Sequence, residues 1–213
     1  MSDAGKRTAA LDGGVFFAFF AATMLVMPTI GWPWYFLAPL AAYALVLVIP
    51  AMRRSMPRLA IGQVGGAPLG LAVIVASGAS VVLIVFDILV RPDVQQLAAK
   101  VPLTLGGSVV LAGAVFAVTN AVCEELVFHW LLWQAIVEEW NAATALAVSA
   151  GFFGLAHLQG YPPGPTGAVL AGAYGLALGI LRWWTGGVGL AIACHVAADA
   201  TIFVILASSS VGA

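Results

Sequence analysis

Long runs of apolar residues make up most of the chain, and short clusters of proline, glycine and charged residues separate them. A helix needs about 20 apolar residues to cross the hydrocarbon core of a bilayer. The runs long enough to do so lie at about 13–31, 33–52, 68–90, 103–139, 142–159, 166–184 and 188–208. The pattern therefore predicts an all-α fold, a polytopic bundle of about seven transmembrane helices.

Two of these runs carry features beyond their length. The run at 103–139 is too long for one straight span, so we expect one crossing followed by an amphipathic continuation. Near the end of the run at 68–90, Asp87 precedes Arg91 by one helical turn. This spacing predicts an i,i+4 pair at the membrane interface.

The composition agrees with a membrane protein. Hydrophobic residues account for 62% of the 213 residues, charged residues for only 8%, and the mean hydropathy is +1.06. Soluble domains are typically about 25% charged. A soluble enzyme, a disordered chain and a nucleic-acid-binding protein are therefore excluded. We expect residues 1–213 to form a single membrane-embedded domain, with the lipid bilayer around it and no nucleic acid as a partner.

The basic residues of the loops predict an orientation, because Lys and Arg concentrate in cytoplasmic loops. With seven spans and the N-terminus inside, the inner side holds six basic residues: Lys6, Arg7, Arg53, Arg54, Arg58 and Arg182. The outer side holds Arg91 and Lys100. We therefore expect an integral membrane protein with a cytoplasmic N-terminus, and the compact size suggests the plasma membrane of a prokaryote.

Ionisable residues inside apolar spans are costly and are candidates for function. Six of them form three clusters along the chain: Glu124, Glu125 and His129; His157, four residues after Phe153; and His195 with Asp199. Residues four apart share a face of a helix, so Glu125 can meet His129. For the same reason His195 can meet Asp199, a pair that would fix the tautomer of the histidine.

Six buried ionisable groups on three spans are most simply satisfied by meeting in one interior cavity. The chemistry alone leaves three interpretations open. The groups hold the bundle together by hydrogen bonds, they carry protons or ions in a transporter, or they form the active site of a hydrolase. Two adjacent glutamates with two distant histidines exceed what packing requires, because packing mostly uses Ser, Thr, Asn and Gln.

The three clusters, in this order and with this spacing, resemble the CAAX protease and bacteriocin-processing family of glutamate intramembrane proteases. The family pattern is Glu-Glu-x-x-x-Arg, then Phe-x-x-x-His, then His-x-x-x-Asn or Asp. The chain has Glu124-Glu125-x-x-x-His129, Phe153-x-x-x-His157 and His195-x-x-x-Asp199. His129 stands where the family usually has arginine. The resemblance covers about 103–208, which we expect to be the catalytic core.

The resemblance implies an intramembrane endopeptidase that hydrolyses a peptide bond with a glutamate-activated water. By this resemblance Glu124 is the general base, and His157 holds and polarises the water. His195 and Asp199 stabilise the oxyanion, and Glu125 with His129 is the supporting pair. The alternative is a non-catalytic membrane protein, such as a proton-coupled transporter or an immunity-type binding protein.

We expect no cofactor, because the glutamate mechanism of the family does not require a metal. Zinc is the open alternative: the catalytic carboxylates and histidines are all good zinc ligands, but the chain has no H-E-x-x-H helix. The expected substrate is a peptide or protein, and the resemblance is compatible with lipid-modified and with membrane-anchored substrates. Counting 1.5 Å per residue does not bring the three clusters to one depth, so a span boundary is displaced or a helix is broken.

Overall fold

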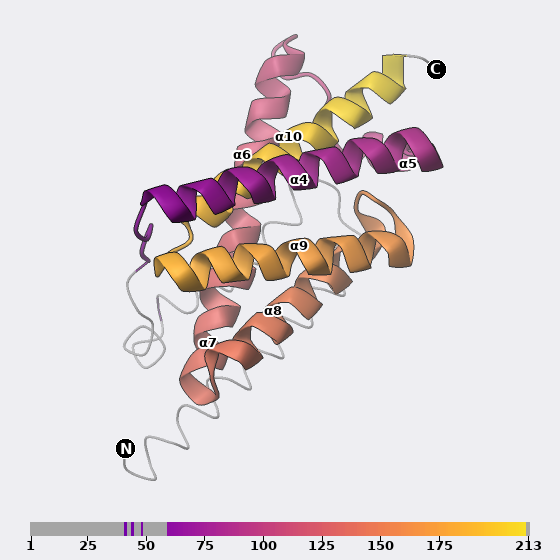
Figure 1. Cartoon of the computed structure of the whole chain (residues 1–213). Helices are drawn as coiled ribbons and strands as arrows, with labels where there is room; N and C mark the ends of the chain where they lie inside the picture. Colours follow the sequence, from indigo (N-terminus) through magenta and orange to yellow (C-terminus); the bar gives the residue numbers. More distant parts are fainter. Residues whose placement is uncertain (1–40, 42–43, 45–47, 49–58, 212–213) are drawn as a thin grey trace.

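The computed structural model describes residues 59–211 together with 41, 44 and 48, and this part of the chain is built of helices and connecting loops (Figure 1). Five helices within it are long and apolar enough to cross a membrane: Gly66–Val90, Val109–Glu138, Ala142–Gln159, Gly164–Thr185 and Gly189–Ser210. They correspond to the third to seventh predicted spans, so the all-helical membrane fold is confirmed. The predicted spans at 13–31 and 33–52 lie outside the described residues, apart from 41, 44 and 48.

The helices follow the chain as α4 (Gly66–Val90), α5 (Gln95–Ala98), α6 (Val109–Glu125), α7 (Trp133–Glu139), α8 (Ala142–Ala156), α9 (Gly164–Thr185) and α10 (Gly189–Val211). Local residues explain several of the ends. The side chains of Ser108 and Asn141 cap α6 and α8 by accepting the backbone N–H groups three residues later, at 3.1 and 2.9 Å. Gly186 ends α9 in the left-handed conformation, with φ of 72°.

The stretch for which we expected one crossing and an amphipathic continuation contains one continuous helix. A π-helical segment, Leu126–Leu132, joins α6 directly to α7. The result is one 30-residue candidate span, which is longer than the about 20 residues that a crossing needs. No glycine or proline interrupts residues 114–139, so the sequence offers no residue at which the helix would break. The helix instead continues through the π-helical segment Leu126–Leu132. Such segments are frequent at functional sites.

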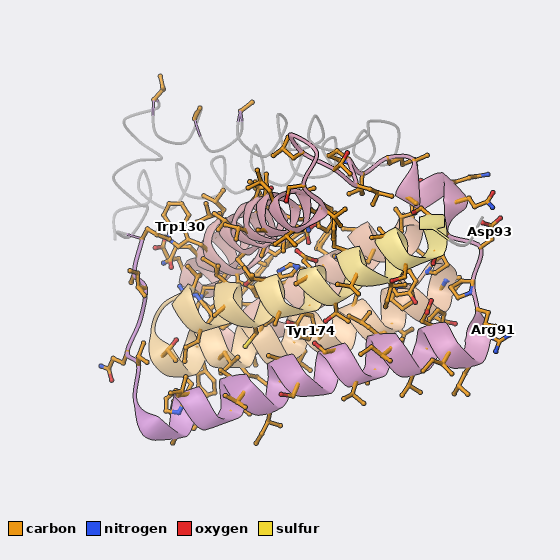
Figure 2. The ribbon with its side chains drawn as sticks, turned by 90° about the horizontal axis from the view of Figure 1, so that it is seen from above. Arg91, Asp93, Trp130 and Tyr174 are labelled. Atoms are coloured by element: carbon orange, nitrogen blue, oxygen red, sulfur yellow. The ribbon has the colours of Figure 1, made fainter. Side chains whose placement is uncertain are left out.

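Helix α10 lies at the centre of the described bundle and α4 at its edge (Figures 1 and 2). Half of the most apolar stretch of α10 is buried, against 11% for α4. The long helix that contains α6 and α7 crosses behind α10, and α8 packs along α9. Exposed apolar side chains cover the outer face of α4: Val73, Ile74, Val81, Ile84, Val85, Ile88 and Leu89. Such a face is suited to lipid contact.

Helix α4 is fastened at both of its ends. At its start, the backbone N–H groups of Val188 and Gly189 donate to the carbonyls of Ala60 and Ile61, at 3.0 and 2.9 Å. At its end, the hydroxyl of Tyr161 donates to Oδ1 of Asp87 at 3.0 Å. α4 therefore runs antiparallel to α9, with its start beside the α9–α10 turn and its end beside the loop that precedes α9.

The contact of Asp87 with Tyr161 replaces the expected pair of Asp87 with Arg91. Arg91 ends α4 in a left-handed conformation, with φ of 48°, and its backbone N–H donates to the carbonyl of Asp87. The ion pairs of the described residues do not include Asp87 with Arg91. The i,i+4 rule applies to residues inside a helix, and Arg91 lies at the point where the helix ends.

Candidate active site

The structure brings all six predicted site residues into one cluster. Glu124 and Glu125 form the end of α6, His129 lies in the π segment, and His157 follows the last residue of α8. His195 and Asp199 face them from α10. The three motifs meet at one level, since Nε2 of His157 and Nε2 of His195 lie 3.6 and 3.7 Å from Oε2 of Glu124. His157 begins a 3-10 turn rather than continuing α8.

The two oxygens of Glu124 have different surroundings. Oε1 accepts a hydrogen bond from Nδ2 of Asn120 at 3.1 Å. Oε2 has no hydrogen-bond partner among the described residues, and it lies 3.6 Å from Nε2 of His157 and 3.7 Å from Nε2 of His195. Glu124 is thus anchored through one oxygen, and the other faces two imidazole rings.

Glu125 is fully buried and is held by two histidines. Its Oε2 lies 2.8 Å from Nδ1 of His129, and its Oε1 lies 2.8 Å from Nδ1 of His195. The expected pair of Glu125 with His129 is therefore present. Nε2 of His129 lies 2.9 Å from the carbonyl oxygen of Gly175, while Nε of Arg182 donates to the backbone carbonyl of His129 at 2.9 Å.

His129 faces two acceptors, a carboxylate oxygen of Glu125 and the carbonyl oxygen of Gly175. A carbonyl oxygen only accepts hydrogen bonds, so Nε2 carries the hydrogen in the contact with Gly175. The family pattern has arginine at this position, which is a cation with several donors. His129 keeps a hydrogen-bond donor at this position on a shorter side chain.

The partner that fixes the tautomer of His195 is Glu125 and not Asp199. Nε2 of His195 lies 3.6 Å from Oδ2 of Asp199, beyond a hydrogen bond, whereas its Nδ1 is 2.8 Å from Glu125. The i,i+4 spacing places His195 and Asp199 on one face, but Nδ1 points across the bundle to α6. His195 thus presents Nε2 to the site, between Glu124 and Asp199.

His157 is oriented by the phenylalanine of its own motif. Nδ1 of His157 lies 2.7 Å from the backbone carbonyl oxygen of Phe153, and the two rings stack with centroids 4.4 Å apart. Because a carbonyl only accepts, Nδ1 carries the hydrogen and Nε2 of the neutral ring is left as an acceptor. The Phe-x-x-x-His motif therefore fixes both the position and the tautomer of His157.

Asn120 is a site residue that the sequence interpretation missed. It is buried on α6, one turn before Glu124, and its Nδ2 donates to Oε1 of Glu124 and to Oδ2 of Asp199, both at 3.1 Å. One amide thus joins two carboxylates from different helices. The available signal was the i,i+4 spacing between Asn120 and Glu124 inside an apolar span.

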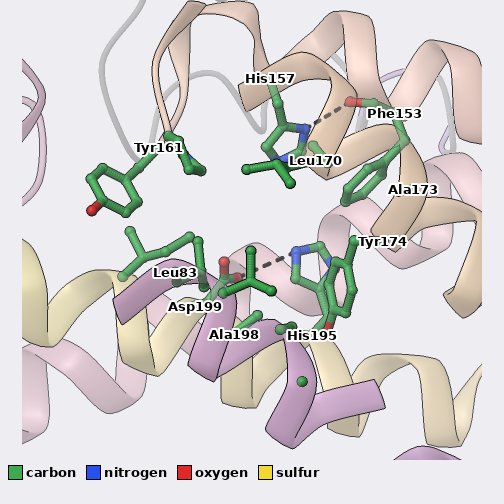
Figure 3. A pocket seen from close by; sticks show the side chains of 16 residues that line it. Leu83, Phe153, His157, Tyr161, Leu170, Ala173, Tyr174, His195, Ala198 and Asp199 are labelled. Carbon is green, nitrogen blue, oxygen red and sulfur yellow. Dashed lines mark hydrogen bonds and ion pairs between the residues drawn. The ribbon is translucent and has the colours of Figure 1, made fainter. Parts of the chain in front are cut away.

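A largely apolar cavity of about 280 Å³ adjoins the cluster (Figure 3). His157 and Tyr161 bound it on one side, and His195 and Asp199 on the other. Residues from four segments line it: Gly78, Ala79, Val82 and Leu83 from α4; Phe153 from α8; Leu170, Ala171, Ala173 and Tyr174 from α9; and Ala198 and Ile202 from α10. The polar groups are therefore reached through an apolar space.

A zinc site would require three or more ligands that converge on one point. Among the described residues, no group of three or more His, Cys, Asp or Glu side chains is arranged to hold a metal ion. The contacts of Nδ1 of His157 with Phe153 and of Nδ1 of His195 with Glu125 leave both Nε2 atoms facing the site.

Comparison with protein families identifies a match to the part of the chain that contains this site. The family model described as type II CAAX prenyl endopeptidase Rce1-like matches residues 106–201. No curated protein and no solved structure matches the chain. The matched segment contains all six predicted site residues, and this family is one of proteases. The resemblance seen in three short motifs is thereby confirmed, and residues 106–201 are similar to the Rce1-like CAAX prenyl endopeptidases.

Proposed function

We propose that the chain is an intramembrane endopeptidase that hydrolyses a peptide bond with a water activated by Glu124. The observation that carries this proposal is Oε2 of Glu124, which faces Nε2 of His157 and Nε2 of His195 at 3.6 and 3.7 Å beside an apolar cavity. Peptide hydrolysis needs a base, a positioned water and a donor to the oxyanion. The cluster supplies one group for each task.

In the first step, water donates one hydrogen to Oε2 of Glu124 and the other to Nε2 of His157. Both atoms are acceptors when Glu124 is ionised and His157 is neutral, so the oxygen of the water can turn its lone pair toward a substrate carbonyl. Glu124 takes the proton as the oxygen attacks the carbonyl carbon. The apolar walls exclude bulk water from this step.

His195 stabilises the oxyanion that forms on the carbonyl oxygen. With its Nδ1–H given to Glu125, the protonated ring offers Nε2–H as the donor to the developing charge. Asp199 acts through His195, because an ionised carboxylate only accepts hydrogen bonds and cannot donate to an oxyanion. Its negative charge near Nε2 stabilises the cationic ring. Asn120 holds Asp199 and Glu124 in place.

Collapse of the tetrahedral intermediate breaks the carbon–nitrogen bond. The proton that Glu124 took from water passes to the leaving amine, which departs as the new N-terminus. The other product is a carboxylic acid, which contains the oxygen of the water. Glu124 returns to its ionised form, so each cycle consumes one peptide bond and one water.

We propose a peptide or protein substrate that presents an apolar, membrane-anchored or lipid-modified segment. The apolar cavity beside the cluster and the apolar outer face of α4 support a substrate that approaches within the bilayer. The supporting pair of Glu125 and His129 keeps His195 in position. We place the chain in a prokaryotic plasma membrane, as its compact size suggests, with a cytoplasmic N-terminus, as the loop charges predict.

The test compares the proteomes of cells that carry the wild-type chain or Glu124→Gln. The substitution keeps the shape of the side chain and removes the base, so uncleaved precursors should accumulate. Purified in lipid nanodiscs, the variant should cleave such a precursor on the order of 10²–10³-fold more slowly than wild type.

Cys123→Ser, at the neighbouring position on the helix, is the matched control and should stay active. Cleavage by Glu124→Gln at a tenth of the wild-type rate or more would contradict the assignment of the base. Uptake of a solute driven by a proton gradient, with no cleaved product, would instead favour a transporter.

A further inference from the structure

Helix α4 forms one wall of the cavity although it lies outside the matched segment 106–201. We propose that α4 selects the substrate, binding an apolar side chain of the peptide next to the bond that is cut. The binding surface is the face formed by Gly78, Ala79, Val82 and Leu83. This inference rests on the proposed function, because it names the substrate class of the same site. The matched segment contains the proposed catalytic groups, and α4 contributes the surface that determines which substrate side chains the cavity accepts.

The chemistry of the cavity defines its occupant. The α4 face is apolar, and so are Leu170, Ala171 and Ala173 of the opposite α9 face, where Tyr174 adds one hydroxyl. The other polar groups are His157 and Tyr161 on one side of the cavity and His195 and Asp199 on the other. A ligand that satisfies both parts presents a polar, hydrolysable group to the histidines and an apolar group to the helices. A peptide bond with a neighbouring apolar side chain meets this description.

The size of the cavity limits the occupant to a small group. Ligand pockets commonly measure about 300–1,000 Å³, and this cavity of about 280 Å³ lies at the lower end. It therefore fits one or two side chains of an extended segment rather than a folded helix. Small residues keep it open from both walls, with Gly78 and Ala79 on α4 and Ala171 and Ala173 on α9.

Gly78 determines how large a side chain the cavity accepts. It is exposed on α4, and a Cβ atom at this position would meet nothing within 4 Å. A larger residue there would therefore enter open space instead of displacing its neighbours. Replacing a helical glycine also favours the helix, so such a variant should fold. A leucine at this position should thus narrow the cavity without disturbing the bundle.

The position of this wall is fixed by contacts that do not involve the cavity. Thr201 of α10 donates to the hydroxyl of Ser80 at 2.9 Å, and Sγ of Cys194 lies 3.3 Å from the carbonyl oxygen of Ala72. Together with the fastened ends of α4, these contacts hold the helix against α10. Selection then depends on the side chains at the face and not on movement of α4.

The first experiment measures cleavage by the full chain in lipid nanodiscs. The probes are synthetic peptides in which each position in turn carries Ala, Val, Leu or Phe. Wild type should prefer a larger apolar side chain at one position beside the cut bond, and Gly78→Leu should lower kcat/KM for Leu and Phe there at least tenfold relative to Ala. Gly70→Leu is the matched control, because Gly70 is exposed on the same helix, has equal space and does not line the cavity. An unchanged preference in Gly78→Leu would overturn the proposal.

The second experiment measures binding without catalysis. The Glu124→Gln chain in nanodiscs is labelled with an apolar peptide that carries photoactivatable leucine. Labelling should fall on Gly78–Leu83 and 170–174, and adding Gly78→Leu should reduce it several-fold while Gly70→Leu does not. Labelling elsewhere, or labelling that ignores Gly78→Leu, would overturn the role of α4. If the wild type cleaves no peptide, the proposed hydrolysis fails, and this second experiment still decides whether α4 binds an apolar peptide.

Discussion

Adjacent glutamates on one helix have different surroundings, because histidine nitrogens approach one of them more closely than the other. Each oxygen of Glu125 lies 2.8 Å from a histidine nitrogen. Glu124 has one oxygen held by Asn120 and the other beside two rings at 3.6 and 3.7 Å. The longer distances around Oε2 of Glu124 leave this oxygen more room to bind a water molecule and accept its proton. This contrast separates the proposed base from its supporting neighbour.

Asn120 should be a positioning residue for Glu124. Asn120→Leu keeps a similar volume but removes the donor to Glu124 and Asp199, so both carboxylates lose their common anchor. We expect kcat to fall tenfold or more while KM changes little, because the cavity walls are untouched. Thr119→Val, at the neighbouring position on α6, is the control. A variant that changes only thermal stability and leaves kcat intact would show that Asn120 is structural.

The buried pair of Glu125 and His129 should appear as an energetic coupling. His129→Ala leaves a buried carboxylate with one partner fewer, and breaking a buried ion pair typically costs about 3–5 kcal/mol. In a double-mutant cycle with Glu125→Gln, the combined variant should lose less stability than the sum of the two. Chemical unfolding in detergent micelles measures the three values. Strict additivity of the two losses of stability would contradict the pairing. In an activity assay, His129→Arg, which places a cation at this position, should still cleave substrate.

Sequence spacing predicted some contacts at this scale and not others. The pair of Glu125 with His129 follows from a single helix, where residues four apart share a face. The contact of His195 with Glu125 depends on how α10 is rotated against α6, and no spacing within one helix contains that information. For the same reason Asn120 was missed as a link between Glu124 and Asp199.

At the scale of elements, two departures from regular α-helix lie next to the motifs. The π segment at Leu126–Leu132 lies between Glu125 and α7, and the 3-10 turn begins at His157. Hydropathy reports that a stretch is apolar but not how its turns are wound, so it predicted the spans and left the depth of the motifs open. It also placed the end of α4 correctly while missing that Asp87 bonds to Tyr161.

The contact of Tyr161 with Asp87 should stabilise the end of α4. Tyr161→Phe removes one hydrogen bond to a carboxylate, which typically contributes about 1.5–3 kcal/mol, and the effect should be at the lower end because the contact is only partly buried. Hydrogen exchange should rise over residues 84–90 and stay unchanged in α9. Tyr174→Phe, on the neighbouring helix, is the control. Equal hydrogen exchange over residues 84–90 in Tyr161→Phe and wild type would show that this contact does not stabilise the end of α4.

The same contact predicts a pH dependence. Burial raises the pKa of Tyr161, and the hydrogen bond to Asp87 raises it further. The folded state therefore keeps the proton where the unfolded chain loses it, above about pH 10. Stability from this group is fully present below that pH and is lost as pH rises further. Tyr161→Phe should consequently show a shallower loss of stability above pH 10, and an identical alkaline slope in both proteins would refute this origin.

For the whole molecule, the arrangement of ends agrees with alternating spans. The start of α4 lies beside the α9–α10 turn, and its end lies beside the loop before α9. Helices α4 and α9 are the first and fourth of the five described spans, and such spans run in opposite directions when the chain crosses a bilayer alternately. The sequence predicted the number and order of these five spans because length and hydropathy decide them. It did not predict that α4, outside the family segment, closes the cavity, since that depends on packing between distant parts of the chain.

The orientation of the molecule is the remaining prediction at this scale. With the N-terminus cytoplasmic, the loop after α4 faces outward and the turn between α7 and α8 faces inward. Lys100 and Trp140 are exposed in these two connections, so a cysteine at either position should be accessible to reagents. A membrane-impermeant maleimide added to intact cells should label Lys100→Cys and not Trp140→Cys, which should react only in inverted vesicles. Wild type is the control, since Cys123 and Cys194 lie within spans. The reverse pattern would invert the protein in the membrane, and labelling of both positions from one side would contradict the alternation of the spans itself.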